Sequence, residues 1–180
     1  MHMIEYLIGV DGGGSGTRVR LARAGATDGL DLATLAEGFA GPSALSQGTA
    51  SAWQAIGTAV AQAFAAAGVT PPPLDRIAIG LGLAGVHNKS WAGEFVEANP
   101  GYQAVALNND GYTTLLGAHG GKPGAIIALG TGSVGYALLA DGTHREVGGW
   151  GFPSGDEGSG AWIGLGAANY VQQGDRKSVV

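Results

Sequence analysis

The chain has no cysteine among its 180 residues, which excludes disulfides, thiolate nucleophiles and cysteine-held zinc or iron–sulfur sites. Charged residues make up only 13% of the chain, well below the roughly 25% typical of soluble domains. With a formal net charge of -5, the composition offers no general attraction to nucleic acid or anionic lipid. No apolar run reaches the roughly 18 residues of a membrane span, and no signal-peptide pattern opens the chain. We therefore expect a cytoplasmic protein that binds neither nucleic acid nor membrane.

Glycine, in contrast, is abundant, with 35 residues against the roughly 7% of an average protein. These glycines lack the three-residue period of collagen, and the 45% hydrophobic content is enough for a sizeable core. We expect a folded chain with many tight turns or close backbone approaches. The length fits one domain, or one domain and part of another.

The first part of the chain reads as a hairpin, a third strand and a helix. Ile4–Val10 is almost continuously apolar, and Arg18–Ala22 alternates outward arginines with inward apolar residues, so we predict two paired strands. Leu32–Glu37 is predicted as a third strand before the turn-like "GFAGPS". Ser46–Ala67 has apolar residues at helical spacing and is predicted as a helix.

The order of predicted elements then continues strand, helix, strand, helix. Arg76–Leu83 and Gln103–Asn108 are strand-like, and Lys89–Ala98 between them is predicted to be helical. After "GGKPG" a strand, a glycine loop and another strand follow again, a weak repeat of the opening plan. We place a domain boundary near residue 120.

A glycine-rich loop, "DGGGSGT", joins the two strands of the predicted hairpin. Glycines leave backbone N–H groups accessible to phosphate oxygens, hydroxyls add donors, and an aspartate at a strand end can support hydrated magnesium. A plain glycine hairpin explains the loop equally well. The candidate phosphate-binding residues are Asp11, Gly12, Gly13, Gly14, Ser15 and Thr17.

A second glycine loop, "GTGS", follows the apolar run "AIIAL". Two such loops, each after an apolar strand, favour a polyphosphate ligand more than either does alone. Its candidate residues are Gly130, Thr131, Gly132 and Ser133.

Between the two loops, "LNNDG" places Asp110 at a strand end. Asp110 is a candidate base for a hydroxyl that attacks phosphorus. Taken alone, the position favours a helix N-cap, and one carboxylate can serve both roles. Further on, "GGWGFPSGDEGSGAW" carries Trp150, Asp156 and Glu157 before a predicted helix from Ser159 to about Gln173. An aromatic face beside carboxylates suits a sugar, whereas a buried tryptophan and an acidic helix start is the structural alternative.

Taken together, these segments resemble the BadF/BadG/BcrA/BcrD ATPase family of the actin-like sugar-kinase superfamily. The matching segments are "GVDGGGSGTRVRLA", "GLGLAG", "LNNDGYTTLLGAHGGKPGAIIALGTGS" and "GGWGFPSGDEGSGAW", in that order. The last two most resemble the bacterial glucosamine kinase and N-acetylglucosamine kinase branch. The resemblance implies an α/β fold: an actin-like (ribonuclease H-like) lobe with a five-stranded mixed sheet, and the start of a second lobe.

The resemblance also implies roles for single residues. Asp11 would support magnesium within a first loop that binds the phosphates of ATP, and Gly130 to Ser133 would form the second. Asp110 would deprotonate the sugar 6-hydroxyl. Thr131, Trp150 and Asp156 match sugar-pocket positions.

We favour glucosamine over N-acetylglucosamine as the acceptor, because Asp156 or Glu157 suits an ammonium group. Ala44 also replaces the asparagine that N-acetylglucosamine kinases often carry. A non-catalytic sugar or nucleotide sensor is the alternative of another class. The acyl-CoA dehydratase activators of the same family use cysteines, which this chain lacks. For the full-length parent, a homodimer is one of the possible oligomeric states.

The second lobe stops early, so we interpret the chain as an inactive fragment. Its predicted parts are a first lobe over residues 1–120, a truncated second lobe over 121–174 and a non-native tail over 175–180. The tail "DRKSVV" matches a translated sequencing-adapter stretch, GATCGGAAGAGCGTCGTG, and a genuine basic tail is the alternative. The underlying nucleotides would decide between the two.

Overall fold

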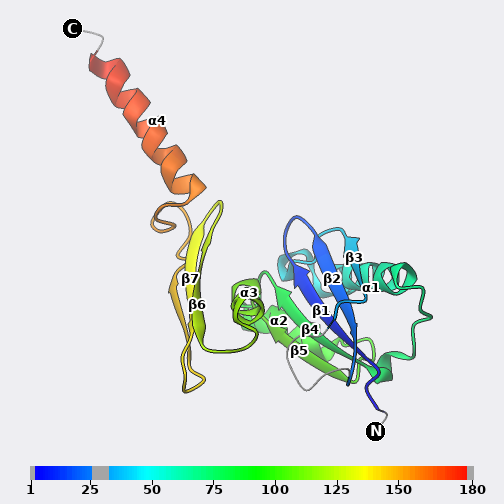
Figure 1. Ribbon diagram of the computed structural model, residues 1–180. Helices are drawn as coiled ribbons and strands as arrows, with labels where there is room; N and C mark the ends of the chain where they lie inside the picture. Colours follow the sequence, from blue (N-terminus) through cyan, green and yellow to red (C-terminus); the bar gives the residue numbers. More distant parts are fainter. Residues whose placement is uncertain (1–2, 26–32, 178–180) are drawn as a thin grey trace. The chain divides into compact units, whose positions relative to one another are not determined.

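The computed structural model describes residues 3–25 and 33–177, and contacts divide the chain into two compact units (Figure 1). The units are Met1–Thr114 and Leu115–Val180, so the division falls within α3 (Asp110–His119), slightly before the predicted boundary at residue 120. Of the predicted tail, 175–177 continue the last helix, and 178–180 lie outside the described residues.

The first unit is built on a five-stranded mixed sheet, as predicted. Its strand order is β3-β2-β1-β4-β5, with β1 antiparallel to β2, β2 antiparallel to β3, and β1, β4 and β5 mutually parallel. Because parallel strands end at the same sheet edge, the residues that follow β1 and β5 lie at one edge. The strands are β1 (Tyr6–Gly12), β2 (Thr17–Arg23), β3 (Ala36–Ala40), β4 (Ile77–Leu83) and β5 (Ala104–Asn108).

The β1–β2 hairpin follows the predicted alternation. Val19 and Leu21 are fully buried, whereas Arg18 and Arg20 are exposed on the opposite face. The buried face of the sheet packs against α1 (Thr49–Ala66), whose buried side chains include Ile56. One hydrophobic core therefore joins the sheet and this helix.

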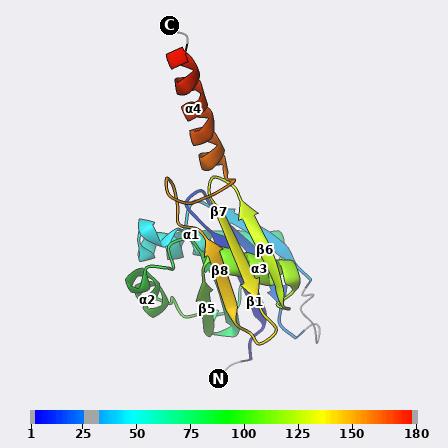
Figure 2. The same cartoon turned by 90° about the vertical axis from the view of Figure 1, so that its left-hand side faces the viewer.

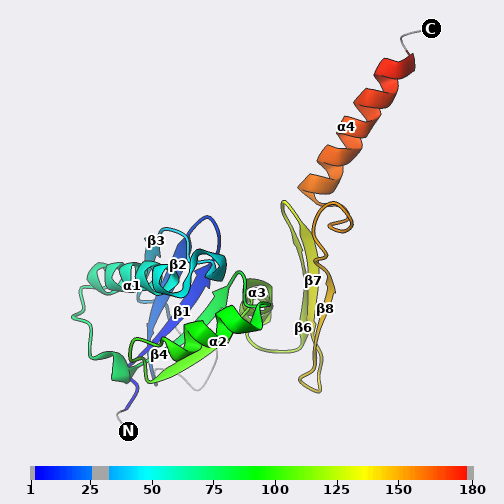
Figure 3. The ribbon, with the colours of Figure 1, turned by 180° about the vertical axis from the view of Figure 1, so that it is seen from behind.

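Two helices, α1 and α2 (Lys89–Glu97), cover one face of the sheet (Figure 3). A short turn of 3-10 helix, Leu45–Gln47, precedes α1 where the sequence predicted the helix itself, and a second lies at Leu74–Arg76. The end of α1 is closed by Gly68 at φ +67°, with Val69 N donating to Phe64 O at 3.1 Å. This Schellman-type turn needs the left-handed conformation that glycine adopts without strain.

The third strand was predicted too early in the chain. The prediction covered 32–37, of which Leu32 lies outside the described residues, whereas β3 extends through Gly38 to Ala40. A Cβ at Gly38 would collide with the backbone of α1 at Ala59 and Ala63. Gly38 is therefore a strand residue that lets a helix approach closely, and not the start of a turn.

The second unit contains an antiparallel sheet of order β6-β7-β8 and the helix α4 (Figure 2). The strands are β6 (Gly124–Leu129), β7 (Ser133–Leu138) and β8 (His144–Gly148), and α4 spans Gly160–Lys177, longer than predicted. One sheet face exposes Ile127, Leu129 and Val147. Within the described residues, no helix is long and apolar enough to cross a membrane.

Candidate functional site

The first glycine loop forms a tight connection between β1 and β2. Gly13 N donates to Gly16 O at 3.0 Å, and Gly13 O accepts from Ser43 N at 3.1 Å and Ala44 N at 3.2 Å. A Cβ at Gly12 would collide with the Ser43 hydroxyl. The loop is therefore held against the segment that follows β3.

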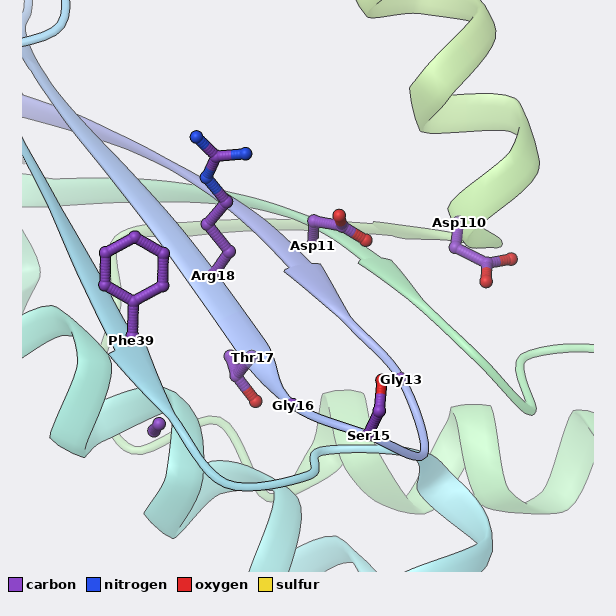
Figure 4. Close-up of a pocket in the computed structure, with 9 residues that line it drawn as sticks. Asp11, Gly13, Ser15, Gly16, Thr17, Arg18, Phe39 and Asp110 are labelled. Atoms are coloured by element: carbon purple, nitrogen blue, oxygen red, sulfur yellow. The ribbon is translucent and has the colours of Figure 1, made fainter. Parts of the chain in front are cut away.

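Beside this loop lies a pocket of about 440 Å³, within the first unit (Figure 4). It brings together residues of the first glycine loop and Asp110, because β1 ends and α3 begins at the same edge of the sheet. Its lining includes the predicted site residues Asp11, Gly13, Ser15, Thr17 and Asp110. Asp11 and Asp110 thus both line one space next to the glycine loop (Figure 4).

Asp110 is the first residue of α3, but its side chain is not the cap that the sequence suggested as an alternative. Asn109 Oδ1 accepts from Tyr112 N at 2.6 Å, which is the N-cap contact. Asp110 Oδ1 accepts from the adjacent Gly111 N at 2.9 Å. Within the described part of the chain, Asp110 Oδ2 has no hydrogen-bond partner. The N-cap contact of α3 is therefore made by Asn109, and not by Asp110.

Arg18 and Phe39 also line the pocket, and the sequence reading did not include them in the site. Arg18 donates through Nε and Nη2 to both carboxylate oxygens of Glu37, at 2.8–3.2 Å, and its guanidinium carbon lies 5.9 Å from the Phe39 ring centroid. Arg20 Nε donates to the same carboxylate at 2.9 Å. The outward arginines of the alternating strand were a usable signal for this cationic wall.

The charge of Glu37 is stabilised by this arrangement. The hydrogen bond from Arg18 holds the pKa of the Glu37 carboxyl below its ordinary value, and Arg20 acts in the same direction, while partial burial opposes both. The cluster of two arginines and one glutamate therefore carries a net positive charge beside the acidic side of the pocket.

The pocket has donors that suit magnesium. Carboxylate and hydroxyl oxygens of Asp11, Asp110 and Ser15 lie around it, and Mg²⁺ typically takes one or two carboxylates together with substrate phosphates and water. Among the described residues, no group of three or more His, Cys, Asp or Glu forms a preformed metal cage. These residues fit an ion that enters with a nucleotide.

The second glycine loop is held by residues from the segment before α4. Ser133 N donates to Asp156 Oδ1 at 3.0 Å, and a Cβ at Gly132 would meet the same carboxylate. The first amides of α4 donate to the loop as well, with Gly160 N to Gly130 O at 2.9 Å. Asp156 is 8% exposed and adopts φ +65°, in the left-handed region. Its carboxylate therefore fixes the loop through one oxygen.

The other predicted sugar-pocket residues differ in their surroundings. Trp150 is 82% exposed, so the buried tryptophan considered from sequence is not observed. Glu157 is exposed, and its backbone carbonyl accepts from Ser133 Oγ at 2.9 Å. Thr131 O accepts from Ala161 N at 3.1 Å. These residues belong to the second unit, whereas Asp110 belongs to the first.

Comparison with known proteins identifies relatives over nearly the whole chain. Residues 8–176 match the model of the BadF/BadG/BcrA/BcrD ATPase family. Glucosamine kinase GspK of Vibrio cholerae is 36% identical over 163 residues, and an N-acetylmuramic acid/N-acetylglucosamine kinase of Clostridium acetobutylicum is 30% identical over 164. Each match covers 90% of this chain but only 53% and 52% of the respective relative. The chain thus spans about half the length of these relatives.

Solved structures show the same partial coverage. A putative N-acetylglucosamine kinase from Chromobacterium violaceum has 58% identity and a TM-score of 0.83, over 94% of this chain and 57% of its own. A second, from Porphyromonas gingivalis, has 17% identity and a TM-score of 0.64 over the same shares, which shows the fold alone. The fold is accordingly that of the actin-like sugar kinases.

Proposed function

The chain belongs to the BadF/BadG/BcrA/BcrD ATPase family, and we propose that it carries the catalytic base and phosphate loops of an ATP-dependent amino-sugar kinase. One observation carries the proposal. Asp110 lines the same pocket as the first glycine loop, and the N-cap contact of α3 is made by Asn109. A proton acceptor beside a phosphate cradle is the arrangement that phosphoryl transfer to a hydroxyl requires.

In the proposed reaction, Asp110 Oδ2 accepts the proton of the sugar 6-hydroxyl as its oxygen bonds to the γ-phosphorus of ATP. The bond from that phosphorus to the β,γ-bridging oxygen breaks, and its electron pair leaves with ADP. Backbone N–H groups of the first loop stabilise the phosphate charge, and Ser15 adds a hydroxyl. Bound Mg²⁺ would supply further charge neutralisation, held by Asp11.

For the second unit, we propose that the second loop binds phosphate and that the segment before α4 binds the sugar. Thr131 and Gly132 supply loop N–H groups, whereas Ser133 N is already bonded to Asp156. Asp156 has no other side-chain hydrogen bond in the described part of the chain, so its second oxygen is proposed to accept from the sugar. Trp150 offers an aromatic face for sugar C–H groups.

Glucosamine is the proposed acceptor, because Asp156 and Glu157 place two carboxylates in the segment before α4 that we propose binds the sugar. N-acetylglucosamine is the second candidate, because the 58% identical structure is that of a putative N-acetylglucosamine kinase. An ammonium group favours a carboxylate partner, whereas an acetamide favours an amide and an apolar patch. The ratio of kcat/KM for the two sugars distinguishes them.

Kinase activity is proposed for the whole protein. We expect the 180-residue chain alone to show negligible turnover, because the relatives that carry the kinase names are about twice as long. A coupled ADP-release assay with glucosamine tests this directly. Turnover in the ordinary enzyme range of roughly 1 to 1000 per second would contradict it.

The function is tested in a chimera in which residues 1–174 replace the matching part of the Chromobacterium violaceum protein. We expect the chimera to phosphorylate an amino sugar, and Asp110→Asn to lower kcat by about 10² to 10⁴. Asp141→Asn, an exposed aspartate in a turn, is the matched control and should leave kcat unchanged. An Asp110→Asn chimera as fast as its parent would refute the base. A chimera that binds Mg–ADP but transfers no phosphate would favour the alternative function of a non-catalytic sugar or nucleotide sensor.

A further inference from the structure

Two buried hydroxyls link the first glycine loop to the segment after β3. Thr17 is 4% exposed and Ser43 is fully buried. Thr17 Oγ1 lies 2.7 Å from Ser43 Oγ and 2.7 Å from Gly41 O. Since a hydroxyl carries one proton, Thr17 accepts from Ser43 when it donates to Gly41 O. Both hydroxyls are thereby satisfied inside the protein.

The backbone of the same segment holds the loop carbonyl. Gly13 O accepts from both Ser43 N and Ala44 N. In a trans peptide the carbonyl and the following N–H point in opposite directions, so Gly14 N–H is directed away from Ser43. The segment from Gly41 to Ala44 thus sets the orientation of the peptide between Gly13 and Gly14, two residues that have no side chains with which to fix it.

We propose that Thr17 and Ser43 are positioning residues, which fix the conformation of the first loop without touching the phosphate. The inference rests on the proposed function of that loop as a phosphate cradle. It reassigns Thr17, which the sequence suggested as a hydroxyl donor to the ligand. The proposal also adds Ser43, a residue that no sequence motif singled out. Ser15, at the exposed tip of the loop, remains its hydroxyl donor to phosphate.

The chemistry of burial supports this division. A buried hydroxyl that already forms hydrogen bonds would have to break them to bind a ligand. The partner left buried without a hydrogen bond would then destabilise the protein. Removing one hydroxyl leaves the other without its contact and loosens the loop. We expect about a tenfold weaker affinity for phosphate, the factor that corresponds to roughly 1.4 kcal/mol.

The test compares Thr17→Val, which keeps the shape but removes the hydroxyl, with Thr17→Ser, which keeps the hydroxyl. Ser43→Ala removes the second hydroxyl, and Thr58→Val on an exposed face of α1 is the matched control. Affinity is measured as binding of magnesium tripolyphosphate by ³¹P NMR titration of the 180-residue chain. Amide hydrogen exchange is measured without ligand at Gly13, Ser43 and Ala44.

We expect Thr17→Val and Ser43→Ala each to weaken binding about tenfold and to speed exchange at these amides by a similar factor. The double variant should lose no more than Thr17→Val alone, because that change already removes the contact between the two hydroxyls as well as the contact to Gly41 O. Thr17→Ser and Thr58→Val should match the unaltered chain. Exchange in β4 should stay unchanged in all variants, which separates local loosening from general destabilisation.

Three results would overturn the proposal. Unchanged exchange in ligand-free Thr17→Val would show that Thr17 does not brace the loop. Weak binding by Thr17→Val without faster exchange at Gly13, Ser43 and Ala44 would show that Thr17 contacts the ligand. Absence of tripolyphosphate binding by the unaltered chain would remove the phosphate function itself, while the exchange rates would still decide whether the brace exists.

Discussion

Replacing Asp156 tests how the second glycine loop is held. Its Oδ1 accepts from Ser133 N at 3.0 Å, and its backbone adopts φ +65°. Asp156→Ala removes the acceptor and places an alanine in a left-handed conformation. Asp156→Asn keeps a side-chain oxygen, and asparagine tolerates the same conformation. The two variants therefore separate loss of the contact from loss of the charge.

The expected cost follows from these two terms. A hydrogen bond to a charged group contributes about 1.5–3 kcal/mol, and the left-handed backbone costs most L-residues about 1–2 kcal/mol. Asp156 already bears part of the backbone term, so we expect Asp156→Ala to destabilise the loop by ~2–4 kcal/mol. Asp156→Asn should cost about 1 kcal/mol, because a neutral acceptor forms a hydrogen bond roughly half as strong.

Hydrogen exchange at Gly160 N reports the effect, because this amide donates to Gly130 O on the same loop. With a factor of ten for every 1.4 kcal/mol, Asp156→Ala should speed its exchange about 30-fold to several hundred-fold. Ala84 N, which donates to Gly12 O in the first unit, is the internal control. Unchanged exchange of Gly160 N in Asp156→Ala would refute the role of Asp156 in holding the second loop. Equal acceleration by Asn and Ala would show that the acceptor oxygen is not the cause.

Three further predictions concern the first unit. Gly38→Ala forces a Cβ into the backbone of α1 and should lower the free energy of unfolding by about 1–3 kcal/mol in urea denaturation. Gly57→Ala, in open space on α1, should raise the free energy of unfolding by about 0.5–1 kcal/mol. Equal effects of the two changes would contradict the close approach of α1 to Gly38. Asn109→Ala should cost about 1 kcal/mol through loss of the α3 cap, and no change in the same assay would exclude that role. Because the pKa of Glu37 lies below its ordinary value of 4.5, its contribution to stability is present above that value and is lost as the pH falls through the folded pKa. An NMR titration should show this lowering, and Arg18→Met should raise the pKa of Glu37 toward its ordinary value; an unmoved pKa would show that Arg18 is not the main cause.

Local patterns predicted most of the fold of the first unit. Alternation in β2 identified both faces of the strand, and the helical spacing of apolar residues located α1 to within a few residues. Gly38 was misread because a glycine in a strand and a glycine in a turn look alike in sequence. Its reason for being glycine is the backbone of α1, which approaches from a distant part of the chain. Contacts of this kind leave no local signal.

The candidate site shows the same limit at single residues. Asp110 was the residue considered as the cap, although the neighbouring Asn109 is an equally good capping residue. The structure assigns the cap to Asn109. Arg18 was correctly predicted to face outward, but its place on the pocket wall depends on the pairing of β2 with β3 and on Glu37.

Both glycine loops pose one physical problem, which explains where the predicted ligand residues need revision. The glycines that present bare N–H groups to phosphate have no side chains with which to hold the loop in shape, so other residues must supply the hydrogen bonds that fix it. In the first loop these come from Thr17 and the Ser43 segment, and in the second from Asp156. Polar residues beside a glycine loop therefore fall into those that contact the ligand and those that hold the loop, and Asp156 is proposed to do both. Burial and satisfied hydrogen bonds identify the second group, and neither property can be read from a motif.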